Sequence, residues 1–308
     1  MIKIERILCP TDLSLEADEA LRYAVALAGA YEAKLFLLCC LVSEAPKNEE
    51  RTPTVAAARL FTESLAPYLN LKINKDLDWQ GLTSETSDGV ANAIVNEAGK
   101  QKIDLIVMRS RRRPIAAKLL GSTAETVCRT APCPVLVTHP KEREWLGPTG
   151  EIGLKRILVA YDFSADAALA LRYGLSLAQE YQTELHLIHV LGTQESEPEL
   201  AWSNASGKGL YKTAARQLQA AVPKEAFLWC NVTSVVRCGN PAEQVLEYSK
   251  QREIDLICIG VSGTRFSLGV LFGSTTDSVL RKTPCPVLVA RPIKSTDPSL
   301  LTEPEPPS

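Results

Sequence analysis

The chain has 308 residues, 45% of them hydrophobic and 23% charged, and this length exceeds the ~100–200 residues of one ordinary domain and predicts two. Its formal net charge of -2 provides no general positive field for a phosphate backbone, so nucleic acid is not an expected partner. No run reaches the ~18 apolar residues of a membrane span, and the start lacks a secretory signal, so we expect a cytoplasmic protein without membrane insertion.

In the first half, short β-rich runs alternate with segments of helical spacing. A first strand is expected at residues 7–10, two residues before Asp12, and later strands at 103–108 and 134–137. Helices are expected at residues 17–31, 55–69, 90–101 and 123–129. Residues 141–153 are first charged and then rich in glycine and proline, which is typical of an interdomain linker.

The second half predicts the same order of elements. Residues 157–161 form a short β-rich run, and Ser164 is a candidate N-cap for a helix with Leu171 and Leu175 at helical spacing. Further strands are expected at residues 184–190, 233–237, 255–259 and 287–290, and further helices at 212–221, 242–251 and 275–281. Strands that alternate with helices predict a parallel sheet with helices on both faces.

Four sequence blocks of the first half recur in the same order in the second half. Residues 7–14, 20–23, 103–108 and 132–137 match residues 157–164, 170–173, 254–259 and 284–289. Because the blocks keep their order across small insertions, they indicate duplication of a whole domain and not a short repeat. We therefore expect a first domain at 1–140, a linker at 141–153, a second domain at 154–292 and a disordered tail at 293–308.

A glycine-rich segment follows the fourth strand of the second half, at the place where ligands bind in open α/β sheets. Gly260 and Gly263 permit positive φ and a close approach of the backbone to a ligand. Gly273, Ser274 and Thr275 open a helix whose N-terminal amides and dipole favour phosphate. A strand-to-helix turn without a ligand is the alternative interpretation.

The segment contains the motif G-x-x-G, followed after nine residues by a glycine and a serine or threonine. This motif resembles the ATP-binding signature of the universal stress protein family, and it is complete at Gly260, Gly263, Gly273 and Ser274. The Val-Leu-Val run after Pro-Cys-Pro and the aspartate after the first strand of each half are further features of that family, so the resemblance covers most of the chain. It implies a Rossmann-like α/β fold of the adenine nucleotide alpha hydrolase type, with two doubly wound, five-stranded, mostly parallel sheets. It also implies that the last strands of the two halves pair, which gives an intramolecular pseudo-dimer.

The same resemblance implies ATP as the ligand, with Mg²⁺, and assigns roles to residues at the ends of three strands. The aspartate after the first strand and the residue that closes the second would contact adenine, and the glycine loop would hold ribose and phosphates. Carried over, the ATP-binding residues are Ala160, Tyr161, Asp162, Val190, Ile259, Gly260, Gly263, Gly273, Ser274 and Thr275. From the residues alone, Asp162 as a cap of the following helix and Val190 as a plain core residue stay open.

The corresponding loop of the first half breaks the signature. Arg109 and Arg112 replace the two leading glycines, and a β-carbon there resists positive φ and moves the backbone away from a ligand. The residues that could keep a residual site are Asp12, Gly121, Ser122 and Thr123. We define the basic loop as Arg109, Arg111, Arg112, Arg113 and Lys118. It could bind an anion, dock an acidic partner or simply be solvated.

The other reactive residues predict neither a metal site nor strong catalysis. His186 and His189 lie two apart on one strand, and most of the nine cysteines lie in apolar runs, so packed histidines and reduced thiols are expected. The sequence holds no nucleophile elbow, Walker lysine loop or kinase catalytic loop. Slow hydrolysis of a well-held ATP is the most that we expect.

Taken together, these features predict an ATP-binding universal stress protein that acts as a nucleotide-responsive regulatory module. ATP would order the loop at residues 261–272 and so change a surface for a protein partner that the sequence does not identify. Two alternatives stay open: a slow ATPase that times this switch, and a nucleotide-free scaffold that uses the basic loop. Association of tandem chains into a homodimer also stays open.

Overall fold

The computed structural model of the chain describes residues 2–12, 14, 18–42, 61–63, 66, 77–110, 122–139, 143–192, 205–261 and 273–291. The strands of the first half are β1 (Arg6–Pro10), β2 (Lys34–Val42), β3 (Trp79–Thr86), β4 (Leu105–Arg109) and β5 (Val135–Thr138), and its helices are α1 (Asp18–Tyr31), α3 (Val90–Lys100) and α4 (Ser122–Thr130). The helix expected at residues 55–69 lies largely outside the described residues, and the tail expected at 293–308 lies entirely outside them.

The second half repeats this plan. Its strands are β6 (Arg156–Ala160), β7 (Glu184–Leu191), β8 (Val232–Cys238), β9 (Leu256–Gly260) and β10 (Val287–Ala290). Its helices are α5 (Ala165–Tyr181), α7 (Ala205–Ala220), α8 (Pro241–Gln251), α9 (Ser274–Lys282) and the short 3₁₀ helix η2 (Lys224–Leu228). Helix α7 begins well before the expected start at residue 212, because the poor helix formers Gly207 and Gly209 conceal the beginning of the helix in the sequence.

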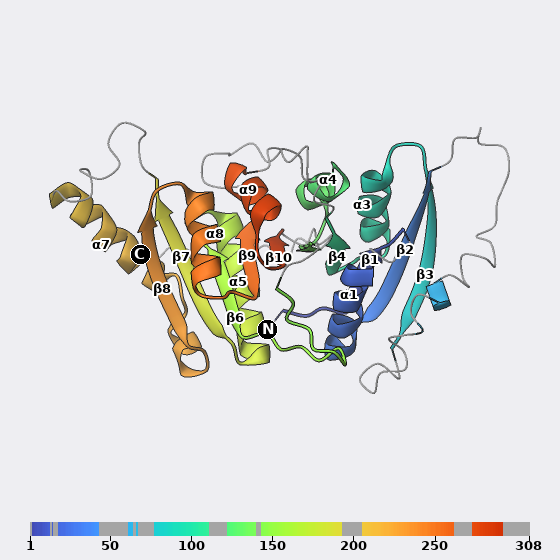
Figure 1. Cartoon of the computed structure of the whole chain (residues 1–308), viewed down its shortest axis with the longest axis horizontal. Coiled ribbons are helices and arrows are strands. Elements are labelled where there is room, and N and C mark those ends of the chain that lie inside the picture. Colours follow the sequence, from blue (N-terminus) through green and yellow to red (C-terminus); the bar gives the residue numbers. More distant parts are fainter. Residues whose placement is uncertain are drawn as a thin grey trace, which may run out of the picture.

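All ten strands lie in one sheet, in the order β3-β2-β1-β4-β5-β10-β9-β6-β7-β8 (Figure 1). Within each half every strand pair is parallel, and the two halves meet where β5 runs antiparallel to β10. The two expected five-stranded sheets are therefore the two halves of a single ten-stranded sheet. The expected pairing of the last strands is confirmed.

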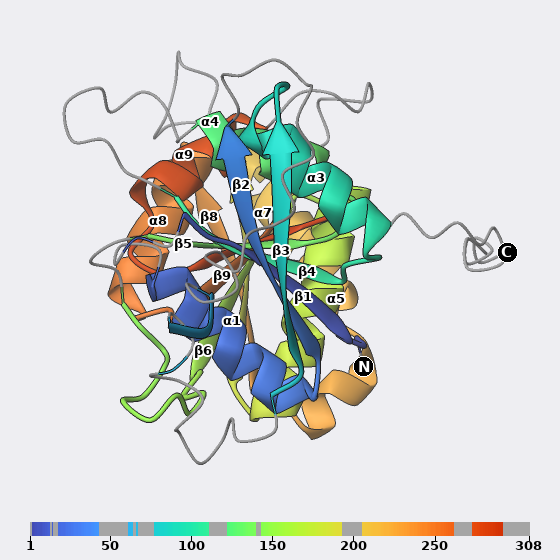
Figure 2. The ribbon, with the colours of Figure 1, turned by 90° about the vertical axis from the view of Figure 1, so that its right-hand side faces the viewer.

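The helices cover both faces of this twisted sheet, which makes three layers (Figure 2). One buried apolar layer contains side chains of α1, α5 and α7, and the other contains side chains of α3, α4, α8 and α9. Neighbouring strand residues alternate between the layers, as Ile157 and Val159 enter the first and Leu158 the second. Because each layer draws on both halves, the halves share two continuous cores. Among the described residues, no helix is both long and apolar enough to cross a bilayer.

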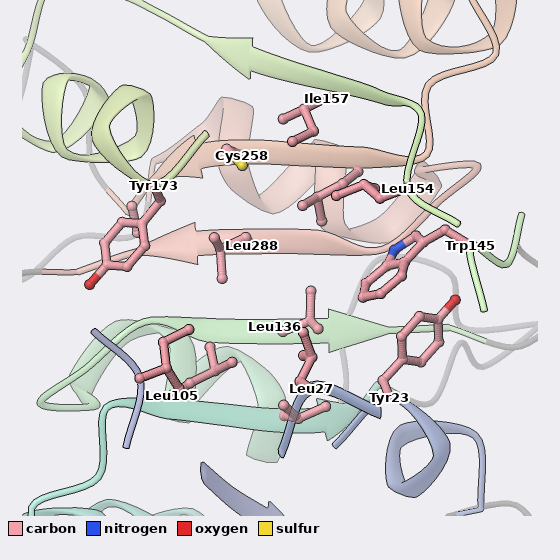
Figure 3. Packing of buried hydrophobic residues seen from close by; sticks show 14 of the residues in the cluster. Tyr23, Leu27, Leu105, Leu136, Trp145, Leu154, Ile157, Tyr173, Cys258 and Leu288 are labelled. Carbon is pink, nitrogen blue, oxygen red and sulfur yellow. The ribbon is translucent and has the colours of Figure 1, made fainter. Parts of the chain in front are cut away.

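The joint between the halves is centred on Leu136 and Leu288, which lie opposite each other in the antiparallel pair. Figure 3 shows these two side chains between the facing strands, with Trp145 and Tyr23 beside them. The rings of Trp145 and Tyr23 meet edge to face with centroids 4.6 Å apart, and both residues are buried. A cavity of about 30 Å³ remains under the joint, which is room for about one or two water molecules.

Arg291, directly after β10, joins the second half to the end of helix α4 in the first. Its Nε donates to the carbonyl of Ala131 at 2.7 Å, and its Nη1 donates to the carbonyls of Cys128, at 3.1 Å, and Arg129. The last carbonyls of a helix lack partners within that helix and carry its negative dipole end, so a guanidinium satisfies them well. Arg291 is thus a cap that one half provides for the other.

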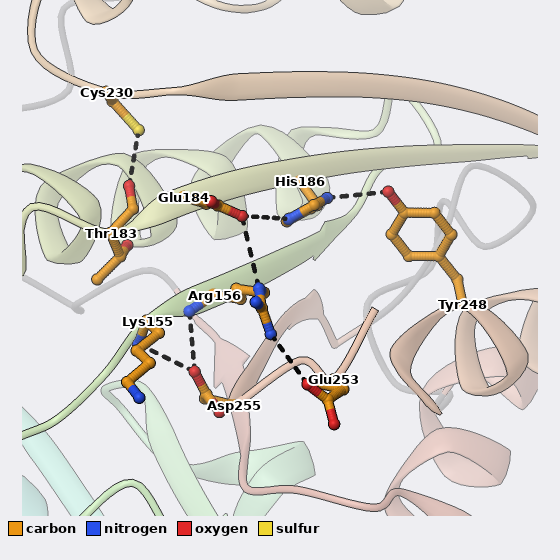
Figure 4. A network of polar contacts seen from close by, with 9 residues as sticks. All are labelled: Lys155, Arg156, Thr183, Glu184, His186, Cys230, Tyr248, Glu253 and Asp255. Atoms are coloured by element: carbon orange, nitrogen blue, oxygen red, sulfur yellow. Dashed lines mark hydrogen bonds and ion pairs between the residues drawn. The ribbon is translucent and has the colours of Figure 1, made fainter. Parts of the chain in front are cut away.

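The strands are also held together at their amino ends. The Asp255 carboxylate accepts hydrogen bonds from the backbone amides of Lys155 and Arg156, each at 2.9 Å, and Asp104 binds the amides of Glu5 and Arg6 in the same way. Figure 4 shows the Asp255 contact next to the ion pairs that Arg156 forms with Glu184 and Glu253. The amino ends of the strands are therefore occupied by structural contacts, while the carboxyl ends lie at the opposite edge.

We predict that the change Arg291→Met lowers the free energy of unfolding by about 2 kcal/mol, because the terminal carbonyls of α4 lose a charged donor while remaining partly buried. Urea unfolding followed by tryptophan fluorescence measures the change. Arg172→Met, at an exposed position of α5, is the control and should alter the stability by no more than about 0.5 kcal/mol. Equal effects of the two substitutions would contradict the role of Arg291 as a cap.

The second prediction concerns Trp145, which lies in the segment expected as a linker and yet is 5% exposed. Trp145→Ala should destabilise the whole chain by about 3–5 kcal/mol, because it removes a large buried ring from the joint. Trp145→Phe, which keeps an aromatic ring against Tyr23, should cost clearly less. A loss below about 1 kcal/mol for the alanine variant, measured by the same unfolding assay, would mean that the segment is only a spacer.

Candidate functional site

The candidate site lies at the carboxyl ends of β6, β7 and β9. Strand β6 pairs with β7 on one side and with β9 on the other, and the connections from β6 and from β9 leave toward opposite faces of the sheet. This is the switch point of strand order, where parallel α/β sheets open a crevice. The predicted residues Ala160, Tyr161, Asp162, Val190, Ile259 and Gly260 all lie at these strand ends.

Asp162 stabilises the turn from β6 into α5. Its Oδ1 accepts hydrogen bonds from the Ser164 backbone amide at 3.1 Å and from the Ser164 hydroxyl at 2.5 Å. The Ser164 hydroxyl oxygen in turn accepts from the amide of Ala167, at 3.1 Å, so Ser164 is the N-cap, as predicted. The alternative that Asp162 itself caps the helix is wrong. Its carboxylate is instead held, half-buried, in the turn directly after β6.

Gly260 ends β9 against the first turn of α5. A β-carbon at this position would lie 2.8 Å from the Cβ of Asp166 and 2.9 Å from its carbonyl carbon, which is closer than real contacts of that kind. The glycine is therefore required by the packing of helix on strand, and the approach brings the N-terminal turn of α5 beside the end of β9. Gly260 does not have the positive φ that the sequence analysis allowed for, so packing and not backbone conformation is the structural reason for this glycine. Its contact with a ligand stays a prediction.

The start of α9 adjoins the same place. The Thr276 hydroxyl donates to the Gly260 carbonyl at 2.8 Å, and the Gly273 amide donates to the carbonyl of Val261 at 3.1 Å. Gly273 is the N-cap and provides no side-chain acceptor. Asp277, the acidic residue of the first turn, is paired with Arg281 through two contacts of 2.5 and 2.8 Å. The positive dipole end of α9 is thus little offset by its own side chains.

The other predicted residues lie around the same strand ends. Ala160 and Val190 are half-buried and pack against the same core layer as buried Ile259. Burial, together with the neighbouring Asp162 charge, raises the pKa of Tyr161, so its hydroxyl stays protonated over the physiological range. Ser274 is exposed and Thr275 half-buried at the start of α9. Gly263 lies outside the described residues.

Two residues of this region were not assigned to the site by the sequence reasoning, which left Phe163 out and expected His189 only as a packed histidine. The ring of Phe163 lies 4.6 Å from that of His189 and 5.3 Å from that of Tyr161, measured between centroids. His189 Nδ1 is also 2.8 Å from the Tyr161 carbonyl oxygen. The sequence could have indicated them, because Phe163 directly follows Asp162 and His189 directly precedes Val190, and both of these neighbours were predicted site residues. His186 is, as predicted, a packed histidine, with Nδ1 2.9 Å from the Tyr248 hydroxyl.

The first half keeps one part of the site and changes another. Asp12 binds Ser14 at the same two distances, 3.1 and 2.5 Å, as Asp162 binds Ser164, but it is exposed. Arg109, in place of Gly260, directs its Nε to 3.4 Å from the Glu19 carboxylate of α1. Burial raises the pKa of Glu19, and the Arg109 charge opposes this shift.

Of the remaining residues predicted for the first half, Thr123 is half-buried in the first turn of α4 and Ser122 begins that helix. Gly121 and the rest of the basic loop, Arg111, Arg112, Arg113 and Lys118, lie outside the described residues. The residual site and the use of the basic loop stay predictions. In the part of the chain that the structure describes, no cluster of histidine, cysteine, aspartate and glutamate side chains could hold a metal ion.

Comparisons with known proteins agree with this arrangement. The chain is 27% identical over 248 residues to a universal stress protein of Mycobacterium tuberculosis, with 80% of this chain and 78% of the relative covered. A universal stress protein of Mycolicibacterium smegmatis is 24% identical over 93% of this chain and 97% of its own length. The crystal structure of a universal stress protein from Archaeoglobus fulgidus has the same fold, with a TM-score of 0.63 at 21% identity over 94% of this chain and 99% of that one.

A model of the universal stress protein family matches the chain twice, at residues 3–139 and 153–291, which correspond to the two halves of the sheet. The two matches together take up most of the chain. The protein therefore belongs to the universal stress protein family.

Proposed function

We propose that the second half binds ATP with Mg²⁺ in the crevice at β6, β7 and β9, and that the chain acts in the stress response as a nucleotide-responsive module. The observation that carries this proposal is the start of α9, which is held against the end of β9 without a side-chain cap. Backbone amides at such a helix start, together with the dipole, favour a phosphate group.

The residues of the crevice fit a nucleotide at both of its ends. At one end, the amides of the first turn of α9 and the hydroxyls of Ser274 and Thr275 would donate to phosphate oxygens. At the other end, the Asp162 carboxylate, held by Ser164, would accept a hydrogen bond from a base. Ala160 and Val190 provide half-buried apolar contact between the two ends.

Magnesium would be held mainly by the phosphates, since the described residues provide no cluster of protein ligands. Bound in that way, the ion offsets the charge of the triphosphate. The chain's own contribution is to orient the nucleotide and to keep its phosphates at the helix start. We propose no catalytic residue, and hydrolysis would be slow.

The path from the crevice to the joint supports a regulatory role. Helix α9 begins at the proposed phosphate position, and its Arg281 lies 3.9 Å from Glu125 of α4 in the first half. A ligand that fixes the start of α9 can therefore favour one arrangement of the α4–α9 contact. This would couple nucleotide binding to the surface that the two halves share.

The first half would not bind ATP in the same way. Arg109 places a bulky side chain where the second half needs a glycine, and its charge is directed to Glu19 and not to a ligand. We therefore predict about one nucleotide per chain when freshly purified protein is denatured and the released nucleotide is measured by mass spectrometry. Two nucleotides per chain would refute the asymmetry, and none would argue for the nucleotide-free scaffold.

We further predict that ATP with Mg²⁺ stabilises the native chain by about 2.7 kcal/mol when its concentration is 100-fold above the Kd. The variant Gly263→Arg, which copies the first half, should lose this effect in a thermal-shift assay. Gly269→Arg introduces the same side chain into the same loop outside the signature and is the matched control. If the control loses the effect equally, added bulk and not the signature explains the loss.

A further inference from the structure

The segment between the two halves packs against helix α1 on one side of the joint. Its Trp145 ring meets the ring of Tyr23 with centroids 4.6 Å apart, and its Glu144 carboxylate lies 3.0 Å from the Arg22 guanidinium. We call residues 143–147 the linker arm. An aromatic contact and a charge contact together hold this arm on the surface of α1.

The linker arm is also held through its backbone. Leu146 pairs antiparallel with Ile152, which lies shortly before β6, and the Gly153 amide donates to the Trp145 carbonyl at 2.8 Å. The site that holds the arm therefore combines side chains of α1 with the backbone of the segment that leads into the second half. Backbone pairing with an extended segment is a common way in which proteins bind peptides.

The duplication places a second copy of this site on the other side of the joint. Counted from the matched blocks, the counterparts of Arg22, Tyr23, Ile152 and Gly153 are Arg172, Tyr173, Ile2 and Lys3. The structure keeps their arrangement, because Ile2 lies against α5, where its amide donates to the Ser176 hydroxyl oxygen at 2.8 Å. In Figure 3, Tyr23 and Tyr173 lie on opposite sides of the joint, and Trp145 adjoins Tyr23.

The second copy differs from the first in what covers it. Among the described residues, no ring contacts Tyr173 and no carboxylate pairs with Arg172, which is exposed. The cavity of about 30 Å³ under the joint is lined by Ile2, Tyr173 and Ser176. The counterparts of these three residues do not line it, since the Trp145 ring lies on that side.

We infer that this second copy is a docking site for an extended segment of a partner protein in which an acidic residue, a tryptophan and a leucine follow one another. The docking site consists of Ile2, Lys3, Arg172, Tyr173 and Ser176. The tryptophan packs against Tyr173, the acidic residue pairs with Arg172, and a carbonyl of the segment accepts from the Lys3 amide. The linker arm fills the matching place and so indicates which chemistry fits. Docking does not require a nucleotide.

One charge differs between the two copies and predicts a preference. Arg143 of the linker arm lies 3.6 Å from Glu253, whose counterpart is the exposed Lys102. The docking site therefore lies near two positive charges, Lys102 and Arg172, where the first copy has one of each sign. A partner segment with a second acidic residue, two positions before its tryptophan, should be preferred. Because exposed ion pairs are weak, this charge adjusts the affinity and does not create it.

The partner's tryptophan needs more room than the cavity of about 30 Å³ provides, since an apolar cavity that holds benzene measures roughly 150 Å³. Ile2, which is half-buried, can provide this room. A single hydrogen bond, to Ser176, holds its amide, whereas Asp104 holds the amides of Glu5 and Arg6 further along. The Ile2 side chain can therefore turn out of the cavity while the start of β1 stays in place.

The test measures binding of a labelled peptide with the sequence of residues 142–148, Glu-Arg-Glu-Trp-Leu-Gly-Pro, to the full chain by fluorescence anisotropy without nucleotide. One peptide should bind per chain. The change Arg143→Glu in the peptide should strengthen binding about threefold, because it adds a second acidic residue. The change Trp145→Ala in the peptide should weaken binding at least about tenfold, because it removes the aromatic anchor.

Substitutions in the chain locate the bound peptide. Arg172→Glu should weaken binding about fivefold, whereas Arg22→Glu, the same change in the first copy, is the matched control and should leave the affinity unchanged. Ile2→Ala enlarges the cavity and should strengthen binding about threefold. Ser176→Trp fills the cavity and should abolish binding. Melting temperatures close to that of the parent chain show that the variants remain folded.

Other results overturn the inference. If the parent chain shows no saturable binding, there is no docking site. Equal binding of the alanine peptide, unchanged binding by Arg172→Glu, or equal losses in Arg172→Glu and Arg22→Glu would place the peptide elsewhere or reduce the contact to general charge. If sedimentation shows a dimer of the chain that the peptide dissociates, the occupant is a second copy, and the assignment to a different protein is wrong.

Discussion

The antiparallel pair of β5 and β10 is the contact on which the rest of this molecule depends. Each half ends in a short, wholly buried apolar strand, which would be an exposed edge if the halves were separate. Pairing the two edges joins two five-stranded sheets into one and makes the apolar layers on both faces continuous. The linker residue Trp145 and the cap residue Arg291 can then cross from one half to the other, because the joint fixes where their partners lie.

The two ends of the strands have different tasks. At the amino ends, Asp104 and Asp255 bind the backbone amides of the neighbouring first strand in each half, so that both halves are held by the same contact. At the carboxyl ends the halves differ, and the second half brings together the start of α9, which has no side-chain cap, the turn at Asp162, and the rings of Phe163 and His189. The contacts at the amino ends are therefore the same in both halves, whereas the residues at the carboxyl ends differ.

Gly260 and Arg109 occupy matching positions at the ends of β9 and β4, and the two residues make different contacts. In the second half the helix start of α5 lies against Gly260, where no β-carbon fits. In the first half Arg109 fills that place and forms an ion pair with Glu19 inside the domain. The position that is a glycine in the second half is thus part of a structural contact in the first. Under the proposed function, one half responds to a nucleotide while the other provides a fixed partner for it across the joint.

The duplication, the alternation of strands and helices, and the glycine signature could all be predicted from the sequence, because they depend on local patterns and on repeats along the chain. The strands β2 and β3 of the first half were not located in this way. The sequence also placed Ser164 as the N-cap of α5. Three further relations are visible only in the folded chain: Asp166 leaves no room for a β-carbon at Gly260, Arg291 caps α4, and Phe163 contacts His189. Each of these relations joins residues far apart in sequence or depends on a backbone angle, and neither spacing nor composition encodes such distances.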